Sequence, residues 1–380
     1  MEQEYKWMVY VSCMTYNHAP YIVDALNGFT MQETTFPYVC AVIDDASTDG
    51  EQEVIKNYLH EHFDLEDKSI VRNEETNDYV LTFARHKSNK NCYFAVLYLK
   101  YNHYSIKKSK APYIKEWRDN CKYIAFCEGD DYWTDKNKLQ KQVDFMEANP
   151  HCAMICNRTR LFSEQQQKYI GENYCSDEDG YLSTKEIILR GGLYISTCSI
   201  LYRESILEKG YPEYCKQCHV GDYPLQIFMA MNGQVYYFNN NMSVYRVGNV
   251  NSWRGQRKTI SIEKRISTVQ SEITMLKGFA KEYPQYHKVL FRRMMAYLHL
   301  NFPDRHYSLK EQKTYCQAFK EFFTCSPWIW KFDLWIRQLR IRGVMRLYPY
   351  SHLKRFQYYV KYYILILLFI CDEYINLTNM

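Results

Sequence analysis

The 380-residue chain is long enough for one large or two medium globular domains, and 47% of its residues are hydrophobic. The formal net charge is only +5, and the absence of a Gly-x-x-x-x-Gly-Lys segment argues against an NTPase. Residues 1–6 form neither a basic nor an apolar signal region, so we expect a cytoplasmic protein whose fourteen cysteines are free thiols.

The N-terminal half alternates predicted strands and predicted helices. Apolar and aromatic runs predict strands at 6–11, 38–43, 69–72 and 123–127. Helical spacing predicts helices at 20–31, around 54–59, at 92–100 and at 136–148, with Ser47 or Thr48 capping the second of them. This alternation predicts an α/β fold with a mostly parallel sheet, which binds ligands at the carboxyl ends of its strands.

The second half begins in the same way and then becomes helical. Further strands are predicted at 152–156, 193–202, 235–238 and 243–246, and helices at 180–190 and 222–231. Residues 101–120 are polar and irregular, and we expect them to form a loop near the site. From residue 256 apolar residues recur at helical spacing, so we predict an α/β domain over 1–253 and a helical C-terminal region over 254–380.

The last part of the chain is basic and then apolar. Basic residues crowd 331–361, which suits a polyanionic partner, either nucleic acid or anionic lipid. The apolar run 362–371 is about half the length that spans a bilayer. We interpret the segment as lying on the inner face of the cell membrane, with no nucleic acid as partner, while a buried final helix is the alternative.

Three carboxylates follow the predicted strand 123–127. Glu128, Asp130 and Asp131 repel one another at the point where the strand enters a loop, and a hard cation such as Mg²⁺ or Mn²⁺ relieves that repulsion. Such a cation completes its coordination with water and phosphate oxygens, so the segment predicts a metal-diphosphate site. A solvated acidic turn is the alternative. Asp44 and Asp45 follow strand 38–43 at the same predicted edge of the sheet.

Five segments together resemble family 2 glycosyltransferases, the bacterial enzymes of GT-A fold that build surface polysaccharides. These segments are Val11-Ser-Cys-Met-Thr-Tyr-Asn17, Val42-Ile-Asp-Asp-Ala-Ser-Thr-Asp49, Cys127-Glu-Gly-Asp-Asp-Tyr-Trp133, Gly221-Asp-Tyr-Pro-Leu225 and Val244-Tyr-Arg246. The resemblance covers residues 5–253 and leaves the helical tail outside. It implies a nucleotide-sugar donor, usually a UDP-hexose, and inversion at the anomeric carbon.

The resemblance also implies a role for each matching residue on the donor side. Thr15, Tyr16 and Asn17 would line the nucleotide pocket, and either Asp44 or Asp45 would hydrogen-bond the base or the ribose.

The metal motif of the family falls on the acidic segment. Asp130 is the expected direct metal ligand and Asp131 the second metal residue. Glu128 stands where the family often has Asp, and its longer side chain would reach a ribose hydroxyl or a metal-bound water.

On the acceptor side, Asp222 matches the catalytic base. An acceptor hydroxyl must lose its proton as it attacks, and a close, desolvated carboxylate suffices for that step. The alternative for Asp222 is a helix N-cap. Trp133 would stack on the acceptor sugar or belong to the core, and Ser196 and Thr197 lie in a stretch that resembles the acceptor-side strand of the family.

Two positions near residue 247 complete the assignment. Arg246 would pair with the donor phosphate or with a structural carboxylate. Relatives often carry a His two residues after this Arg, where the present chain has Gly248, and His219 is the candidate substitute.

The predicted function is therefore metal-dependent transfer of a hexose from a UDP-sugar to a saccharide or lipid-linked saccharide acceptor. A metal hydrolase is a rival, although the phosphate-binding residues it needs cannot be assembled here. The second alternative is a catalytically weak or inactive transferase-fold protein that acts as a membrane-bound partner, because a fold alone does not establish activity.

Overall fold

The computed structural model of the chain describes residues 5–248, 260–303 and 307–324. The chain divides into two compact units: residues 1–259 with 271–293, and residues 260–270 with 294–380. The predicted domain boundary after residue 253 lies outside the described residues and stays a prediction.

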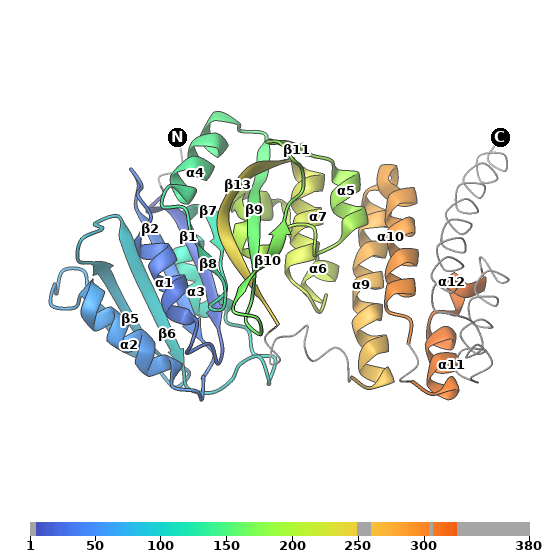
Figure 1. Ribbon diagram of the computed structural model, residues 1–380, viewed down its shortest axis with the longest axis horizontal. Coiled ribbons are helices and arrows are strands. Elements are labelled where there is room, and N and C mark those ends of the chain that lie inside the picture. Colours follow the sequence, from blue (N-terminus) through green and yellow to red (C-terminus); the bar gives the residue numbers. More distant parts are fainter. Residues whose placement is uncertain (1–4, 249–259, 304–306, 325–380) are drawn as a thin grey trace. The chain divides into compact units, whose positions relative to one another are not determined.

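The strands of the first unit form one mixed sheet (Figure 1). They are β1 (Trp7–Thr15), β2 (Tyr38–Asp44), β3 (Phe63–Asp64), β4 (Arg72–Glu75), β5 (Tyr79–His86), β6 (Cys92–Leu99), β7 (Cys121–Phe126), β8 (Tyr132–Trp133), β9 (Cys152–Ser163), β10 (Lys168–Asn173), β11 (Gly180–Leu182), β12 (Leu201–Arg203) and β13 (Gln234–Val247). Their order is β11, β13, β9, β12, β7, β1, β2, β6, β5, β3, with β10 beside β9, β4 beside β5 and β8 beside β13.

The centre of this sheet is parallel, and it positions the site. β7, β1, β2 and β6 run in one direction, whereas β12 and β5 flank them antiparallel. Thr15 at the end of β1 is in register with Asp44 at the end of β2. The loops that follow β1, β2 and β7 therefore meet at one edge.

Helices cover both faces of the parallel strands. On one face α1 (Ile22–Thr30), α2 (Glu51–His62) and α4 (Lys138–Ala148) share a core with Val11, Val42 and Val96, and α1 lies beside α2 (Figure 1). α3 (Ala111–Arg118) contacts β1, β2 and β7, and its buried Ile114 and Trp117 do not belong to that core cluster, which places them on the opposite face.

The remaining elements lie further along the chain. They are α5 (Thr184–Arg190), α6 (Glu213–Lys216) and α7 (Asp222–Asn232), the short 3-10 turns Thr197–Ser199, Glu204–Lys209 and Pro284–Tyr286, and the C-terminal helices α9 (Ile262–Glu282), α10 (His287–Leu300), α11 (Leu309–Ala318) and α12 (Lys320–Thr324). The predicted α/β class with a mostly parallel central sheet and C-terminal helices is thus confirmed.

Several predicted elements were wrong. Residues 92–100 form strand β6 rather than a helix, because a strand buried on both faces is apolar at every position. Residues 67–70 form a turn, and the strand there begins only at Arg72. The predicted loop 101–120 contains α3, and the predicted helix 180–190 begins with strand β11. The N-cap of α2 is Gly50, with φ of +91°, rather than Ser47 or Thr48.

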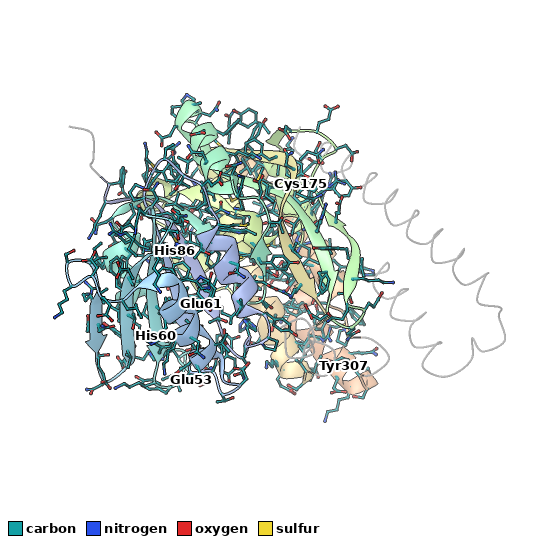
Figure 2. The ribbon with its side chains drawn as sticks, turned by 60° about the vertical axis from the view of Figure 1, so that its left-hand side comes forward. Glu53, His60, Glu61, His86, Cys175 and Tyr307 are labelled. Atoms are coloured by element: carbon teal, nitrogen blue, oxygen red, sulfur yellow. The ribbon has the colours of Figure 1, made fainter. Side chains whose placement is uncertain are left out.

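The described part of the second unit has its own polar and aromatic contacts. The Tyr307 hydroxyl (labelled in Figure 2) donates to the Ile260 carbonyl at 2.6 Å and accepts from Arg265 Nε at 3.1 Å. α11 begins with a capping box in which Ser308 and Glu311 satisfy each other's backbone N–H groups.

None of the helices within 5–248, 260–303 and 307–324 is both long and apolar enough to cross a membrane. The basic stretch 331–361 and the apolar run 362–371 lie outside the described residues. The cysteines of the described part are free thiols, and most of them are buried.

Candidate active site

The acidic loop after β7 runs against the end of β1. The Cys127 N–H donates to the Ser12 carbonyl at 3.2 Å, and the Gly129 N–H donates to the Met14 carbonyl at 3.0 Å. A Cβ at position 129 would lie 2.1 Å from Thr15 Oγ1, so only glycine allows the loop to approach this closely. The loop that carries Glu128, Asp130 and Asp131 is therefore held directly over Thr15.

Glu128 of the acidic loop interacts electrostatically with Asp222, the predicted catalytic base. Its pKa is raised to about 7, first by desolvation and then by the charges of Asp130 and Asp222. Its side chain is nevertheless exposed. Exposure and desolvation are compatible when water reaches a carboxylate from one side while protein surrounds it on the others. The three carboxylates thus share one electrostatic neighbourhood, although they come from two distant segments.

Asp131 faces inward. It is 1% exposed, its Oδ1 accepts the Arg246 backbone N–H at 2.9 Å, and its pKa is raised by burial and by Asp130. A buried carboxylate that fastens one strand to a loop has little access to a solvated cation. The geometry does not support the prediction of Asp131 as a metal ligand.

Asp130, like Glu128, can be reached from solvent, and it lies beside an imidazole. Its side chain is 20% exposed, and Asp130 Oδ2 lies 3.8 Å from His18 Nε2. Groups of three or more His, Cys, Asp or Glu side chains that could hold a metal do not occur among the described residues. A carboxylate with one imidazole still fits a cation whose other positions are filled by diphosphate and water.

Hydrogen bonds connect the turn after β1 to the loop after β2. The Asn17 N–H donates to Ser47 Oγ at 2.9 Å, and the Thr48 N–H donates to Asn17 Oδ1 at 2.8 Å. Asn17 has a φ of +56°, which Asn tolerates better than most residues. Tyr16 in the same turn is 43% exposed. The predicted nucleotide-binding residues Thr15, Tyr16 and Asn17 are thus brought together in one rigid turn.

Asp44 and Asp45 differ in what remains available to a ligand. Asp45 Oδ1 accepts the His103 N–H at 2.7 Å, and its Oδ2 accepts the Tyr104 N–H at 3.1 Å and lies 2.9 Å from Lys110 Nζ. Asp44 Oδ1 accepts from Ser47 and Gln52, while its Oδ2 is buried with no hydrogen-bond partner in the described part of the chain. Asp44 is therefore the one of the two with an unused acceptor.

Asp222 lies at the start of α7, close enough for its charge to act on Glu128 of the acidic loop. It is the first residue of this helix, and its Oδ1 accepts the Tyr223 N–H at 2.8 Å. The Thr197 hydroxyl donates to Asp222 Oδ2 at 3.3 Å, and Ser196 Oγ accepts from Asn173 Nδ2 at 2.9 Å. The N-cap is Gly221, so the alternative reading of Asp222 as the cap residue was wrong. Thr197 therefore hydrogen-bonds Asp222, whereas Ser196 hydrogen-bonds Asn173 of β10.

Arg246 binds carboxylates of the protein. Its guanidinium is 2.7 Å from Glu164 Oε1, also pairs with Asp24, and donates to the Asp130 carbonyl at 2.7 Å. The group stacks over the Tyr132 ring at 4.6 Å. The alternative of a structural ion pair is favoured over the predicted donor phosphate.

Trp133 is part of the core, and its prediction as an acceptor-stacking residue was wrong. It is 2% exposed, its Nε1 donates to the Cys198 carbonyl at 2.8 Å, and Lys138 Nζ lies 4.3 Å from its ring centroid. Burial lowers the pKa of Lys138 to about 8. The ring cannot present a face to a sugar, because protein surrounds it on both sides.

Gly248 has a φ of +91°, a conformation that L side chains rarely adopt. A histidine at this position would therefore be strained. His219 contacts the helical region through its backbone N–H, which donates to Ser271 Oγ at 3.1 Å.

Sequence reasoning missed His18 and Glu51. Glu51 is fully buried, and it accepts hydrogen bonds from Thr15 Oγ1, the His18 N–H at 2.9 Å and Ser47 Oγ at 2.8 Å. The available signal was the spacing of Thr15 and His18 within one turn and the position of Glu51 at the start of a predicted helix.

Comparisons with known proteins agree with this architecture. No protein-family model matches the chain. The sequence is 28% identical over 236 residues to uncharacterized proteins of Mycobacterium bovis and Mycobacterium tuberculosis. The match covers 61% of this chain and 57% of theirs, so the chain spans little more than half of their length.

Two solved structures resemble this chain, and for one of them the likeness is high enough to show a common fold. TarS 1-349 of S. aureus in complex with UDP has a TM-score of 0.52 at 15% identity, covering 84% of this chain and 81% of that one. Mannosyltransferase PcManGT from Pyrobaculum calidifontis, in complex with GDP-Man and Mn²⁺, has a TM-score of 0.47 at 14% identity, covering 94% and 85%. The second likeness is too low to carry an argument. The first shows that this chain shares the fold of TarS, and the predicted fold class is confirmed.

Proposed function

We propose that the chain is an inverting glycosyltransferase that moves a hexose from a UDP-sugar to a saccharide or lipid-linked saccharide acceptor. The observation that carries this proposal is the convergence of Asp222 with Glu128 and Asp130, since the charges of both aspartates raise the pKa of Glu128. A protein of the same fold, TarS, binds UDP in its solved structure, which supports the choice of nucleotide.

The donor would lie along the carboxyl edge of β1, β2 and β7. Asp44 Oδ2 accepts no hydrogen bond among the described residues, and because the side chain is fully buried, the imino group of a uracil base would satisfy it only if the surrounding loops open. Tyr16, in the turn after β1, offers an exposed ring. Asp45 acts here as a positioning residue, because His103, Tyr104 and Lys110 already occupy its carboxylate.

The diphosphate would be bound beside Asp130. The pairing of a reachable carboxylate with the imidazole of His18 fits a divalent cation, Mg²⁺ or Mn²⁺. When bound, such a cation neutralises the charge that grows on the departing diphosphate. Gly129 and Arg246 hold the loop in place, the first by allowing close approach to Thr15 and the second by binding the Asp130 carbonyl.

Asp222 would remove the proton of the acceptor hydroxyl. Its Oδ2 is oriented by the Thr197 hydroxyl and its Oδ1 by the Tyr223 N–H. The carboxylate of Asp222 lies in the same electrostatic neighbourhood as Glu128, the pKa of which its charge raises. Attack from the Asp222 side, with the diphosphate leaving on the Asp130 side, would invert the anomeric carbon.

The test is transfer with a panel of nucleotide-sugars and saccharide acceptors, together with an Asp222→Asn variant. A group that takes a proton in the transition state contributes about 10²- to 10⁴-fold, so the variant should lose transfer by this factor and still bind UDP. UDP binding is measured by thermal shift, because ligand binding stabilises the fold. Undiminished transfer would remove Asp222 from the mechanism, and UDP binding without any transfer would favour the inactive partner protein.

Membrane association is a separate part of the proposal. It rests on the basic and apolar C-terminal segments, which lie outside the described residues. A chain that ends before Phe356 should be released from vesicles containing anionic lipid, whereas the full chain should bind them. Retention of the shortened chain on the vesicles would exclude this anchor.

A further inference from the structure

His18 and Asp130 meet at the edge of the sheet without forming a hydrogen bond. His18 Nε2 lies 3.8 Å from Asp130 Oδ2, which exceeds the length of a hydrogen bond. The imidazole is 19% exposed and the carboxylate 20%, so a small ion can reach both.

The other ring nitrogen of His18 reveals which atom carries the proton. Thr15 Oγ1 donates to Glu51 Oε1, and it lies 3.1 Å from His18 Nδ1. A hydroxyl has one proton to donate, so Thr15 must accept from His18 Nδ1–H. Glu51 also accepts hydrogen bonds from the His18 N–H at 2.9 Å and the Ser47 hydroxyl at 2.8 Å, so donors surround its carboxylate. This arrangement assigns the proton to Nδ1 and leaves the lone pair of Nε2 facing Asp130.

A lone pair that faces a carboxylate is repulsive unless a positive charge lies between them. The same arrangement, with one ring N–H held by a protein acceptor and the second nitrogen directed outward, orients histidines that bind metals. Two ligands at about 2.1 Å from one octahedral cation are about 3.0 Å apart when adjacent and about 4.2 Å apart when opposite. The observed 3.8 Å is longer than the adjacent separation and shorter than the opposite one, so the two side chains must shift slightly to share one octahedral cation.

We propose that His18 Nε2 and Asp130 Oδ2 are the two protein ligands of the divalent cation, with diphosphate and water completing its coordination. This inference rests on the proposed function for the diphosphate. A mixed imidazole and carboxylate set favours Mn²⁺ over Mg²⁺, because imidazole suits transition metals better than it suits Mg²⁺. Thr15 and Glu51 are positioning residues for the imidazole.

The supports of His18 are rigid. The Ala19 N–H donates to Asp49 Oδ2 at 2.9 Å, and the His18 N–H is bound by buried Glu51. The acidic loop cannot shift toward Thr15, because the Gly129 backbone already touches that side chain. The backbone that carries each ligand is thus held in place before the cation binds, so that only a small side-chain adjustment remains, which lowers the cost of forming the site.

The experiment is Mn²⁺ binding to the purified full chain, with and without UDP, followed by electron paramagnetic resonance. Pulsed measurements detect a nitrogen bound directly to Mn²⁺, so the wild type should show one bound Mn²⁺ with a ¹⁴N coupling. His18→Asn should lose this coupling and bind Mn²⁺ about 100-fold more weakly. Thr15→Val should weaken binding by about 10-fold and keep the coupling, because it removes only the orienting acceptor.

The matched control is His60→Asn, a substitution at an exposed histidine of α2 that is labelled in Figure 2. This variant should bind Mn²⁺ as the wild type does, and circular dichroism checks that each variant is folded. Bound Mn²⁺ without a ¹⁴N coupling, equal affinity in His18→Asn, or no bound Mn²⁺ in either buffer would overturn the inference.

The same samples test the UDP-sugar donor and the cation ligands separately. Failure of UDP to stabilise the chain would refute the UDP-sugar donor, while Mn²⁺ binding in UDP-free buffer still tests His18. Conversely, UDP binding that is independent of Mn²⁺ and unchanged in His18→Asn would refute the cation ligand and leave the donor proposal standing.

Discussion

The loops that follow β2 and β7 both place acidic residues at the same edge of the sheet, and they use them differently. In the first loop Asp45 is saturated by two backbone N–H groups and Lys110, and Asp49 accepts from the Ala19 and Glu51 N–H groups. In the second loop the pKa values of Glu128 and Asp131 are raised, because burial and neighbouring carboxylates disfavour their charge.

This difference separates acids that hold the structure, such as Asp45 and Asp49, from Glu128 and Asp130, which remain accessible to a ligand; Asp131, although in the second loop, is buried against Arg246 and belongs with the structural acids. A carboxylate with several N–H donors stabilises its loop in the absence of any cation. Carboxylates that repel one another cost free energy until a cation binds. Variants at matched positions should therefore lose stability in the first loop and lose ligand binding in the second.

The largest expected effect concerns Trp133, which follows the second loop but belongs to the core. Trp133→Ala should lower the free energy of unfolding by about 4 kcal/mol, because it leaves a large cavity beside Phe29 and removes a hydrogen bond to Cys198. Urea denaturation measures the change. Trp133→Phe should be milder, with UDP affinity unchanged, and a selective loss of acceptor binding in this variant would restore the stacking role.

Asp45→Asn should lower the free energy of unfolding by about 3 kcal/mol, since Lys110 loses its partner in a nearly buried pair. The matched variant Asp130→Asn should change the stability of the metal-free chain by less than about 0.5 kcal/mol. Thermal unfolding with EDTA compares the two. Equal losses in both variants would mean that the acidic loop is as structural as the loop after β2.

Gly129→Ala should affect both stability and Mn²⁺ binding, because the added Cβ would lie 2.1 Å from Thr15 Oγ1. The loop must lift, at a cost of about 2 kcal/mol, and Mn²⁺ affinity should fall as Asp130 moves away from His18. The control is Gly180→Ala, where a Cβ meets nothing within 4 Å. Wild-type Mn²⁺ affinity in Gly129→Ala would contradict the close contact.

The smallest expected effect is the pH dependence of Glu128. Its pKa in the folded state, about 7, is above the ordinary value of 4.5, so its ionisation removes stability as the pH rises from 4.5 to 7. In EDTA the Tm of the wild type should therefore fall relative to Glu128→Gln over this range, and Mn²⁺ should reduce the difference. Glu61→Gln, at an exposed position of α2 labelled in Figure 2, should show no such trend.

The sequence was sufficient for β1, β2 and β7 of the parallel centre, but not for β6, and it was sufficient for the edge where the loops after those three strands meet. The prediction of secondary structure failed where one hydrophobic pattern is compatible with both a strand and a helix. The run Cys92–Leu99 is apolar throughout, so its periodicity cannot separate a strand buried on both faces from a helix. β13 was predicted as two short strands, because Asn239, Asn240 and Asn241 interrupt the apolar pattern where the register shifts.

The candidate site was predicted only in part, because the sequence does not show which distant segments come into contact. Acidic residues after strands are visible in the sequence, but their hydrogen-bond partners come from distant segments, as His103 and Lys110 do for Asp45. Trp133 and Arg246 were placed on the ligand side, although their surroundings are protein. Which acids are satisfied is a tertiary property that spacing alone does not contain.

Arg246 connects three segments that are far apart in the chain. It pairs with Asp24 on α1 and with Glu164 after β9, and it holds the acidic loop through Asp130 and Asp131. Segments fastened at one point open together rather than singly. In native-state hydrogen exchange, the Arg246 amide should therefore exchange through the same opening as the neighbouring amides of β13, and replacing Arg246 should divide that single cooperative opening into independent local ones.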